Sequence, residues 1–171
     1  MMRPGNKKGG FTLLEVVLSL ILAGIIGTIA GLGLVQFTKG FIFAKRNTVT
    51  AQKGQMTTSR LMKEFGAITS ILSSPAPTAF SITYSRNPSD PTDTHTVAST
   101  GGTGPVTLDG DTLTDQVQSF RLDYYTAYND TSSPATYSAA TIMIQITLEL
   151  VGADNVTSQF VSRVFLYGLV E

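Results

Sequence analysis

The sequence contains no cysteine in its 171 residues, and histidine occurs once, at position 95. Disulfide bonds, iron–sulfur clusters, cysteine-ligated zinc and thiol nucleophiles are therefore excluded. His95 lies in the polar segment Asp-Pro-Thr-Asp-Thr-His, and no nucleophile pattern surrounds it. We expect a solvated loop residue rather than a catalyst, so an enzyme is not supported.

An excess of charge of either sign is also lacking, because 12 basic residues balance 12 acidic ones. A neutral chain has no broad electrostatic attraction for nucleic acid, and no such partner is expected. We expect Tyr124, Tyr125 and Tyr128 to serve the core or an interface rather than to stack on bases. The glycine-rich segment 101–104 lacks the lysine and the strand–helix setting of a phosphate-binding loop.

One long segment carries no charge at all: the twenty residues from Val16 to Val35 are mostly Leu, Ile, Val, Ala and Gly. As a helix this segment would be roughly 30 Å long, which matches the hydrocarbon core of a bilayer. An ordinary secretory signal is disfavoured, because the apolar run is too long and no Ala-x-Ala site follows it. The segment therefore predicts a membrane-spanning helix.

Glu15 is a carboxylate at the edge of this apolar segment. An ionisable group at membrane depth costs about 3 kcal/mol even on the gentler scales, so its presence indicates a function. The alternative is that Glu15 lies at the membrane interface and reaches back to the lipid headgroups.

The residues before and after Glu15 carry a family resemblance. A basic leader ending in glycine precedes the segment Phe11–Val16, and the uncharged run follows at once: Lys7-Lys8-Gly9-Gly10, then Phe11-Thr12-Leu13-Leu14-Glu15-Val16. This arrangement resembles the class III leader and mature start of type IV pilins and pseudopilins. The resemblance covers about the first 35 residues, and every element of the family pattern is present.

The resemblance implies that prepilin peptidase cuts between Gly10 and Phe11 on the cytoplasmic side and N-methylates Phe11. It also implies that the Glu15 carboxylate meets the Phe11 amine of a neighbouring subunit during assembly. Two unit charges about 4 Å apart attract by about 4 kcal/mol at an effective dielectric constant near 20. The implied partners are other pilin-like subunits and an assembly-platform membrane protein.

Small residues recur every four positions along the apolar segment, at Ala23, Gly27 and Gly31. Such a face lets helices approach closely in lipid or in a filament core, although glycine is also common in membrane helices generally. Basic residues flank both ends of the segment, so the positive-inside rule does not settle its orientation. The cytoplasmic N-terminus and the periplasmic C-terminal domain are implied by the resemblance, as is location in the bacterial inner membrane and then in a filament.

The helix is predicted to continue beyond the membrane to about Leu72, ended by Ser73-Ser74-Pro75. Apolar residues with helical spacing form one stripe on this second half: Leu61, Phe65, Ile68 and Leu72. The predicted divisions are a cleaved leader at 1–10, a transmembrane and assembly helix at 11–38, its amphipathic continuation at 39–73, and a β-rich periplasmic domain at 74–171.

From residue 78 onward the apolar spacing changes to two. Strand-like alternation occurs around residues 80–84, 120–124, 142–150 and 160–167, and the sequence Asp109-Gly110 predicts a tight hairpin between 106–108 and 111–113. Polar segments at 86–105 and 129–138 predict surface loops. The order predicts an α+β fold in which the long helix packs on a mostly antiparallel sheet.

Asp109, Asp111 and Asp115 are weak candidates for a calcium site, because Ca²⁺ takes several oxygen ligands. Their spacing is not that of an EF-hand, and Asp-Gly-Asp is also what a hairpin turn favours. No cofactor is otherwise expected.

The favoured interpretation is a structural subunit, a minor pseudopilin or minor pilin placed at the tip or acting in initiation of a secretion pseudopilus or a type IV pilus. The spacing from Leu113 to Tyr124, followed by a long strand and a closing strand, resembles the J-type minor pseudopilins of type II secretion and the W-type minor pilins. The alternative is a single-pass membrane-anchored binding or sensor protein with an extracytoplasmic β domain. The mature N-terminus discriminates the two.

Overall fold

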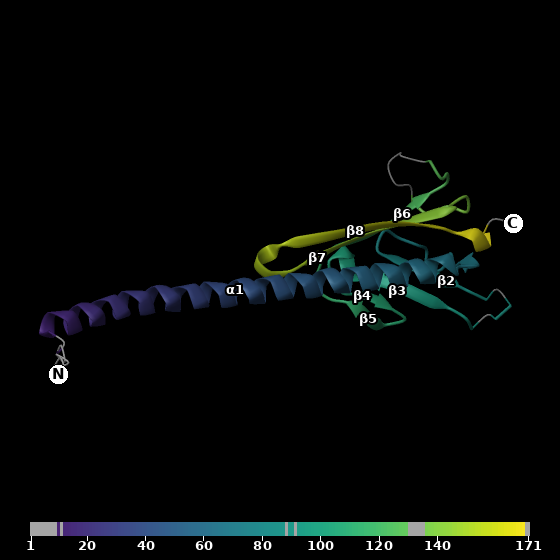
Figure 1. Ribbon diagram of the computed structural model, residues 1–171. Helices are drawn as coiled ribbons and strands as arrows, with labels where there is room; N and C mark the ends of the chain where they lie inside the picture. The colour runs from purple at the N-terminus through teal and green to yellow at the C-terminus, as the bar shows by residue number, and fades with distance from the viewer. Residues whose placement is uncertain (1–9, 11, 88, 91, 130–135, 170–171) are drawn as a thin grey trace, which may run out of the picture. The chain divides into compact units, whose positions relative to one another are not determined.

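The computed structural model describes residue 10 and residues 12–87, 89–90, 92–129 and 136–169. In these residues one long helix, α1 (Leu13–Gly66), is followed by eight strands and three short 3-10 helices (Figure 1). The strands are β1 (Ser70–Ile71), β2 (Ser81–Ser85), β3 (His95–Ser99), β4 (Val106–Leu108), β5 (Asp111–Thr114), β6 (Val117–Tyr125), β7 (Met143–Val151) and β8 (Thr157–Phe165); the 3-10 helices are η1 (Thr100–Gly102), η2 (Ala153–Asn155) and η3 (Tyr167–Leu169). The chain divides into two compact units, one ending at Ile42 and the other beginning at Phe43.

Helix α1 ends at Gly66, so the prediction that the helix reaches about Leu72 and that a helical segment spans 39–73 was wrong at its end. After the helix the backbone turns into a sheet instead. The amide of Thr69 donates to the Ser85 carbonyl at 3.0 Å, and the amide of Leu72 donates to Thr83 at 2.9 Å. Pairing with β2 satisfies these groups better than one more helical turn, and it stops the helix before the proline.

The predicted stripe was therefore half right. Leu61 and Phe65 lie on α1 and are fully buried. Ile68 is buried as well, but it reaches the core from the segment after the helix. The ring of Phe65 meets that of Tyr84 edge-on, with 5.9 Å between centroids.

The first sheet has the order β1-β2-β3-β4-β5, and all its neighbours are antiparallel. The hairpin β4–β5 confirms the turn prediction, because Asp109 and Gly110 have φ angles of 55° and 90°, and a type I′ turn needs positive φ at both positions. The interpretation of 86–105 as one loop was wrong, since β3 lies inside it. Val97 is the one large apolar residue in β3, which leaves too little alternation to reveal a strand.

The second sheet has the order β6-β7-β8, again antiparallel. The central strand, β7, has the clearest strand pattern in the sequence. Four alternating residues of β7 face the core and are fully buried, namely Ile144, Ile146, Leu148 and Leu150. Within the second unit, α1 approaches this sheet closely at Gly54, where a Cβ atom would clash with the ring of Phe160. The α+β fold with a long helix on antiparallel sheets is confirmed.

Candidate functional site

The first half of α1 is an apolar surface that no other described residue covers. Large apolar side chains from Leu13 to Phe43 are all exposed, at fractions from 84% at Leu13 to 37% at Phe43. The helix is long and apolar enough to cross a membrane, and none of its most apolar window is buried by the described part of the chain. A soluble protein rarely leaves so much contiguous apolar surface bare, so this surface needs lipid or a protein partner.

The hydroxyl groups in this apolar half are already satisfied by the helix itself. Ser19 donates to the carbonyl of Glu15 at 2.7 Å, Thr28 donates to Ile25 at 2.8 Å, and Thr38 donates to Leu34 at 2.9 Å. A hydroxyl bonded in this way exposes no unpaired donor to hydrocarbon. These three hydroxyl groups are therefore compatible with apolar surroundings.

Glu15 lies in the first turn of α1, and its backbone is held by Thr12. The Glu15 amide donates to the Thr12 carbonyl at 3.0 Å and lies 3.3 Å from Thr12 Oγ1, the position of an N-cap hydroxyl. A carboxylate in the first turn is also favoured by the helix dipole. Sequence reasoning missed this role, although the signal was present: Thr-x-x-Glu before an apolar run is the capping-box pattern.

The other predicted assembly residues are placed only in part. Gly10 is described and exposed, whereas Phe11 lies outside the described residues, so the junction between them is untested. Gly27 and Gly31 lie on α1 with Ala23, and a Cβ added at either glycine would meet no atom within 4 Å. Their role in helix packing stays a prediction.

In the second unit, α1 and the first sheet share a buried carboxylate. The side chain of Glu64 is 4% exposed and accepts three donors. Arg60 lies 2.9 Å from its Oε1, while Arg86 Nη1 at 3.1 Å and the hydroxyl of Tyr84 at 3.2 Å both reach Oε2. Burial, and then the negative charge of Glu64, raise the pKa of Tyr84, so this hydroxyl remains a donor.

His95 continues this network toward the β4–β5 turn, which corrects the expectation of a solvated loop residue. Its Nδ1 lies 2.7 Å from Asp109 Oδ2, and its Nε2 lies 3.0 Å from Asp93 Oδ1 and beside Arg86. The hydrogen bond to Asp109 is the largest influence that raises the pKa of His95, and burial opposes it. The residue therefore ties together segments that are distant in the sequence.

The three aspartates considered for calcium do not form a common site. Asp109 is engaged by His95 and by the amide of Thr96 at 2.7 Å, and Asp115 pairs with Lys53 at 2.7 Å. Among the described residues, no group of three or more His, Cys, Asp or Glu side chains is placed to hold a metal ion. Asp111 lines a groove together with Asp109, and Asp115 is not among the residues that line it.

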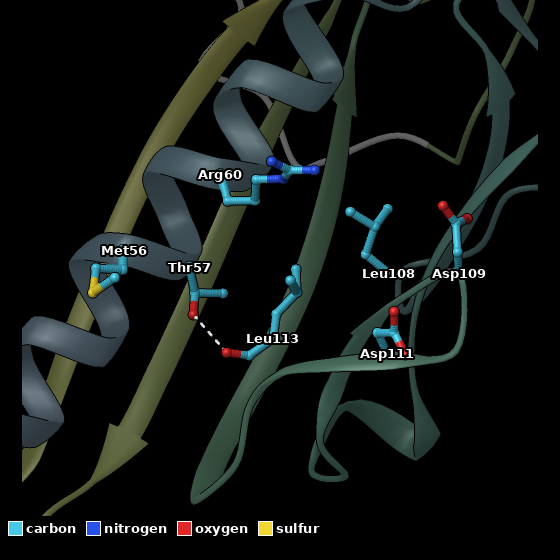
Figure 2. Close-up of a pocket in the computed structure, with 7 residues that line it drawn as sticks. All are labelled: Met56, Thr57, Arg60, Leu108, Asp109, Asp111 and Leu113. Atoms are coloured by element: carbon cyan, nitrogen blue, oxygen red, sulfur yellow. Dashed lines mark hydrogen bonds between the residues drawn. The ribbon is translucent and has the colours of Figure 1, made fainter.

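That groove, of about 500 Å³, runs between α1 and the β4–β5 hairpin (Figure 2). Met56, Thr57 and Arg60 line it from the helix, and the hairpin contributes Leu108, Asp109, Asp111 and Leu113. One weak hydrogen bond crosses it, from the Thr57 hydroxyl to the Leu113 carbonyl at 3.5 Å. Asp109 and Arg60 are already engaged by His95 and Glu64, so the groove is mainly a seam between packed elements.

Comparison with known proteins gives a match at the N-terminus. Residues 5–31 match the family model "Prokaryotic N-terminal methylation motif". Searches of curated proteins and of solved structures gave no match.

The methylation motif is the class III prepilin leader, and it supports the type IV pilin-like family. It includes the predicted leader junction, Glu15 and the small residues at 23, 27 and 31, and it ends well before the sheets begin. The motif and the exposed apolar helix together support a pilin or pseudopilin subunit of a type IV pilus or secretion system. Proteins of this kind are anchored in the inner membrane, are processed by prepilin peptidase and assemble with other pilins.

Proposed function

We propose that this chain is a minor pseudopilin or minor pilin, which assembles into a filament through α1 at the tip or during initiation. One observation carries the proposal: the methylation motif leads directly into an apolar helix whose side chains nothing in the described chain covers. A cleavable leader makes the helix start at a defined residue, and the bare surface supplies the contact area.

In this proposal residues 1–10 are the leader, residues 11–38 form the transmembrane and assembly segment, and the second half of α1 with the sheets forms the periplasmic domain. Prepilin peptidase cuts between Gly10 and Phe11 and methylates Phe11. The Glu15 carboxylate then pairs with the Phe11 amine of a neighbouring subunit. The pair fixes the register of docking more than it strengthens docking, because desolvation cancels much of the attraction of a buried ion pair.

The test is the mature N-terminus together with Glu15→Ala. Mass spectrometry of the chain from its native host is expected to show N-methyl-Phe11 as the first residue. Glu15→Ala is expected to be cleaved and inserted normally but to be absent from assembled filaments, while Ser19→Ala, one turn further along the helix, assembles like the wild type. A chain that keeps Met1 would instead be a single-pass membrane-anchored binding or sensor protein.

A further inference from the structure

The second sheet ends in an edge strand that lacks the usual protections. Strand β8 is nine residues long, contains no proline and no lysine, and pairs with β7 from end to end without a bulge. Its only charged residue is Arg163. Long edges of this kind pair readily with other chains, and proteins normally shorten, charge, bend or cover them.

The other three edges of the two sheets are protected in those ways. Strand β1 has only two residues, and β5 has four, with Leu113 as an extra residue in its pairing with β4. The carbonyl of Leu113 in β5 accepts the hydroxyl of Thr57 from the helix. On β6, the amide of Leu122 donates to the carbonyl of Ala79 at 2.7 Å, so the segment between β1 and β2 covers that edge. Of the four sheet edges in the described structure, β8 is therefore the one without these protections.

The register identifies which backbone groups of β8 are free. Leu166 donates to the Ile142 carbonyl, and Gly152 donates to the Val156 carbonyl, so the even-numbered residues of this strand bond to β7. In an antiparallel pair the alternate residues then direct their N–H and C=O groups away. These are the five odd-numbered positions from Thr157 to Phe165, and no hydrogen bond from another described residue reaches their backbone groups.

A groove of about 350 Å³ runs beside this edge, between β8 and α1. Its walls are Gln55, Thr58, Ser59 and Met62 of the helix and residues 159–162 of the strand. Thr58 is 5% exposed, and its Oγ1 is buried without a hydrogen-bond partner among the described residues. An unpaired buried hydroxyl is costly, and an incoming backbone amide or carbonyl would satisfy it.

We infer that the edge of β8 and this groove bind an extended segment of a neighbouring, different subunit, which adds a fourth strand to the β6-β7-β8 sheet. The free backbone groups require an extended polypeptide, since alternating N–H and C=O groups are complementary to another strand. Met62 and Phe160 in the groove favour apolar side chains on one face of the segment. Arg163, which lies on β8 just outside the groove, favours an acidic side chain beside it. This inference rests on the proposed function, because it names a partner surface of an assembling subunit.

The direction in which the chain runs argues against a second copy of this protein as the occupant of the β8 edge. Two β8 edges related by a two-fold axis pair antiparallel, so the second copy is reversed along its strand. Within the second unit, α1 and β8 run along each other, so that copy's helix would be reversed as well (Figure 1). Two chains anchored in one bilayer point the same way, so this symmetric pairing is disfavoured, and we assign the edge to a segment of a different subunit.

Backbone hydrogen exchange of the full-length chain tests the inference directly. In the chain purified in detergent, the amides of residues 157, 159, 161, 163 and 165 should exchange fast, while the intervening amides are protected by β7. In native assemblies the five fast amides should become protected. Unchanged fast exchange in assemblies would overturn the inference, and so would protection in the detergent-solubilised chain that accompanies a dimer.

Val161→Pro provides a matched variant, because it removes an amide that points away from β7 and so leaves the β7–β8 ladder intact. Val161→Pro should abolish the protection of the outward-facing β8 amides and the incorporation of the chain into assemblies. Val161→Thr, which keeps the amide, should preserve both. Thr58→Val should fold normally and show weaker protection of β8. Incorporation of Val161→Pro at the wild-type level would refute the inference. A mature N-terminus at Phe11 combined with an unprotected β8 would refute only the added strand and leave the proposed function standing.

Discussion

His95 and Asp109 face each other across the first sheet, with Nδ1 of the histidine 2.7 Å from Oδ2 of the aspartate. The second oxygen of Asp109 accepts the amide of Thr96, so the turn that begins the β4–β5 hairpin is fastened to β3 at two points. The far side of the His95 ring is held by Asp93. One imidazole thus joins the segment before β3 to the tip of the next hairpin.

This arrangement makes stability depend on pH in a defined direction. The hydrogen bond to Asp109, opposed by burial and helped by Asp93, raises the pKa of His95 above its ordinary value of 6.5. A group whose pKa is raised by folding stabilises the fold below its unfolded pKa, and that contribution is lost as the pH rises through the folded pKa. Urea unfolding of the full-length chain in detergent is therefore expected to show a falling midpoint from about pH 6 upward.

His95→Gln is the control for the pH effect, because glutamine keeps a donor but does not titrate. Its urea midpoint should stay flat over the interval in which the wild type falls. A parallel decline in both proteins would assign the effect to some other group.

Glu64→Gln is expected to destabilise the chain by about 1.5–3 kcal/mol, the range for hydrogen bonds to charged groups. The change leaves Arg60 and Arg86 without their shared carboxylate, and both are partly exposed, which limits the cost. Lys63→Gln, at the neighbouring helix position, should change stability by less than about 0.5 kcal/mol. Denaturant unfolding of both variants measures the difference, and equal losses would contradict a special role for Glu64.

Gly54→Ala is expected to cost about 1–3 kcal/mol by overpacking, because the new methyl group would overlap the ring of Phe160. Gly40→Ala is the matched substitution on the same helix, and there a Cβ meets nothing within 4 Å. Since alanine is the better helix former, Gly40→Ala should stabilise the helix slightly. Thermal unfolding compares the two, and the double variant Gly54→Ala with Phe160→Leu should recover part of the loss if the clash is its cause.

Calcium is expected to leave the chain unchanged. Asp109 and Asp115 are engaged by His95 and Lys53, and the described residues bring no third ligand to either. Thermal unfolding in millimolar calcium should therefore match unfolding with chelator. A calcium-dependent rise in the midpoint that Asp111→Asn abolishes would restore the calcium site.

Regular periodicity made much of the fold predictable from the sequence. The alternation of Ile144 to Leu150 marks a central strand, and Asp109-Gly110 marks a type I′ turn, because each depends on local rules. The end of α1 was not predictable in the same way. Competition between one more helical turn and pairing with β2 is decided by contacts distant in the sequence.

The polar features were the least visible in the sequence. His95 stands in a run of polar residues, and only folding brings Asp109 and Arg86 to its ring. The free edge of β8 was also hidden, since the sequence shows a strand but not which strands border it. By contrast, Glu15 was recognisable because a charge beside a long apolar run is anomalous in any context.

The internal hydrogen bonds of Ser19, Thr28 and Thr38 have a consequence for how the helix can travel. For these three hydroxyl groups, no hydrogen bond to a bilayer or a neighbour has to be broken when the segment leaves one set of surroundings for another. In the proposed function, withdrawal of the segment from a membrane into a filament would then exchange one apolar contact for another at these three positions. The hydroxyl groups would add no polar barrier to that transfer.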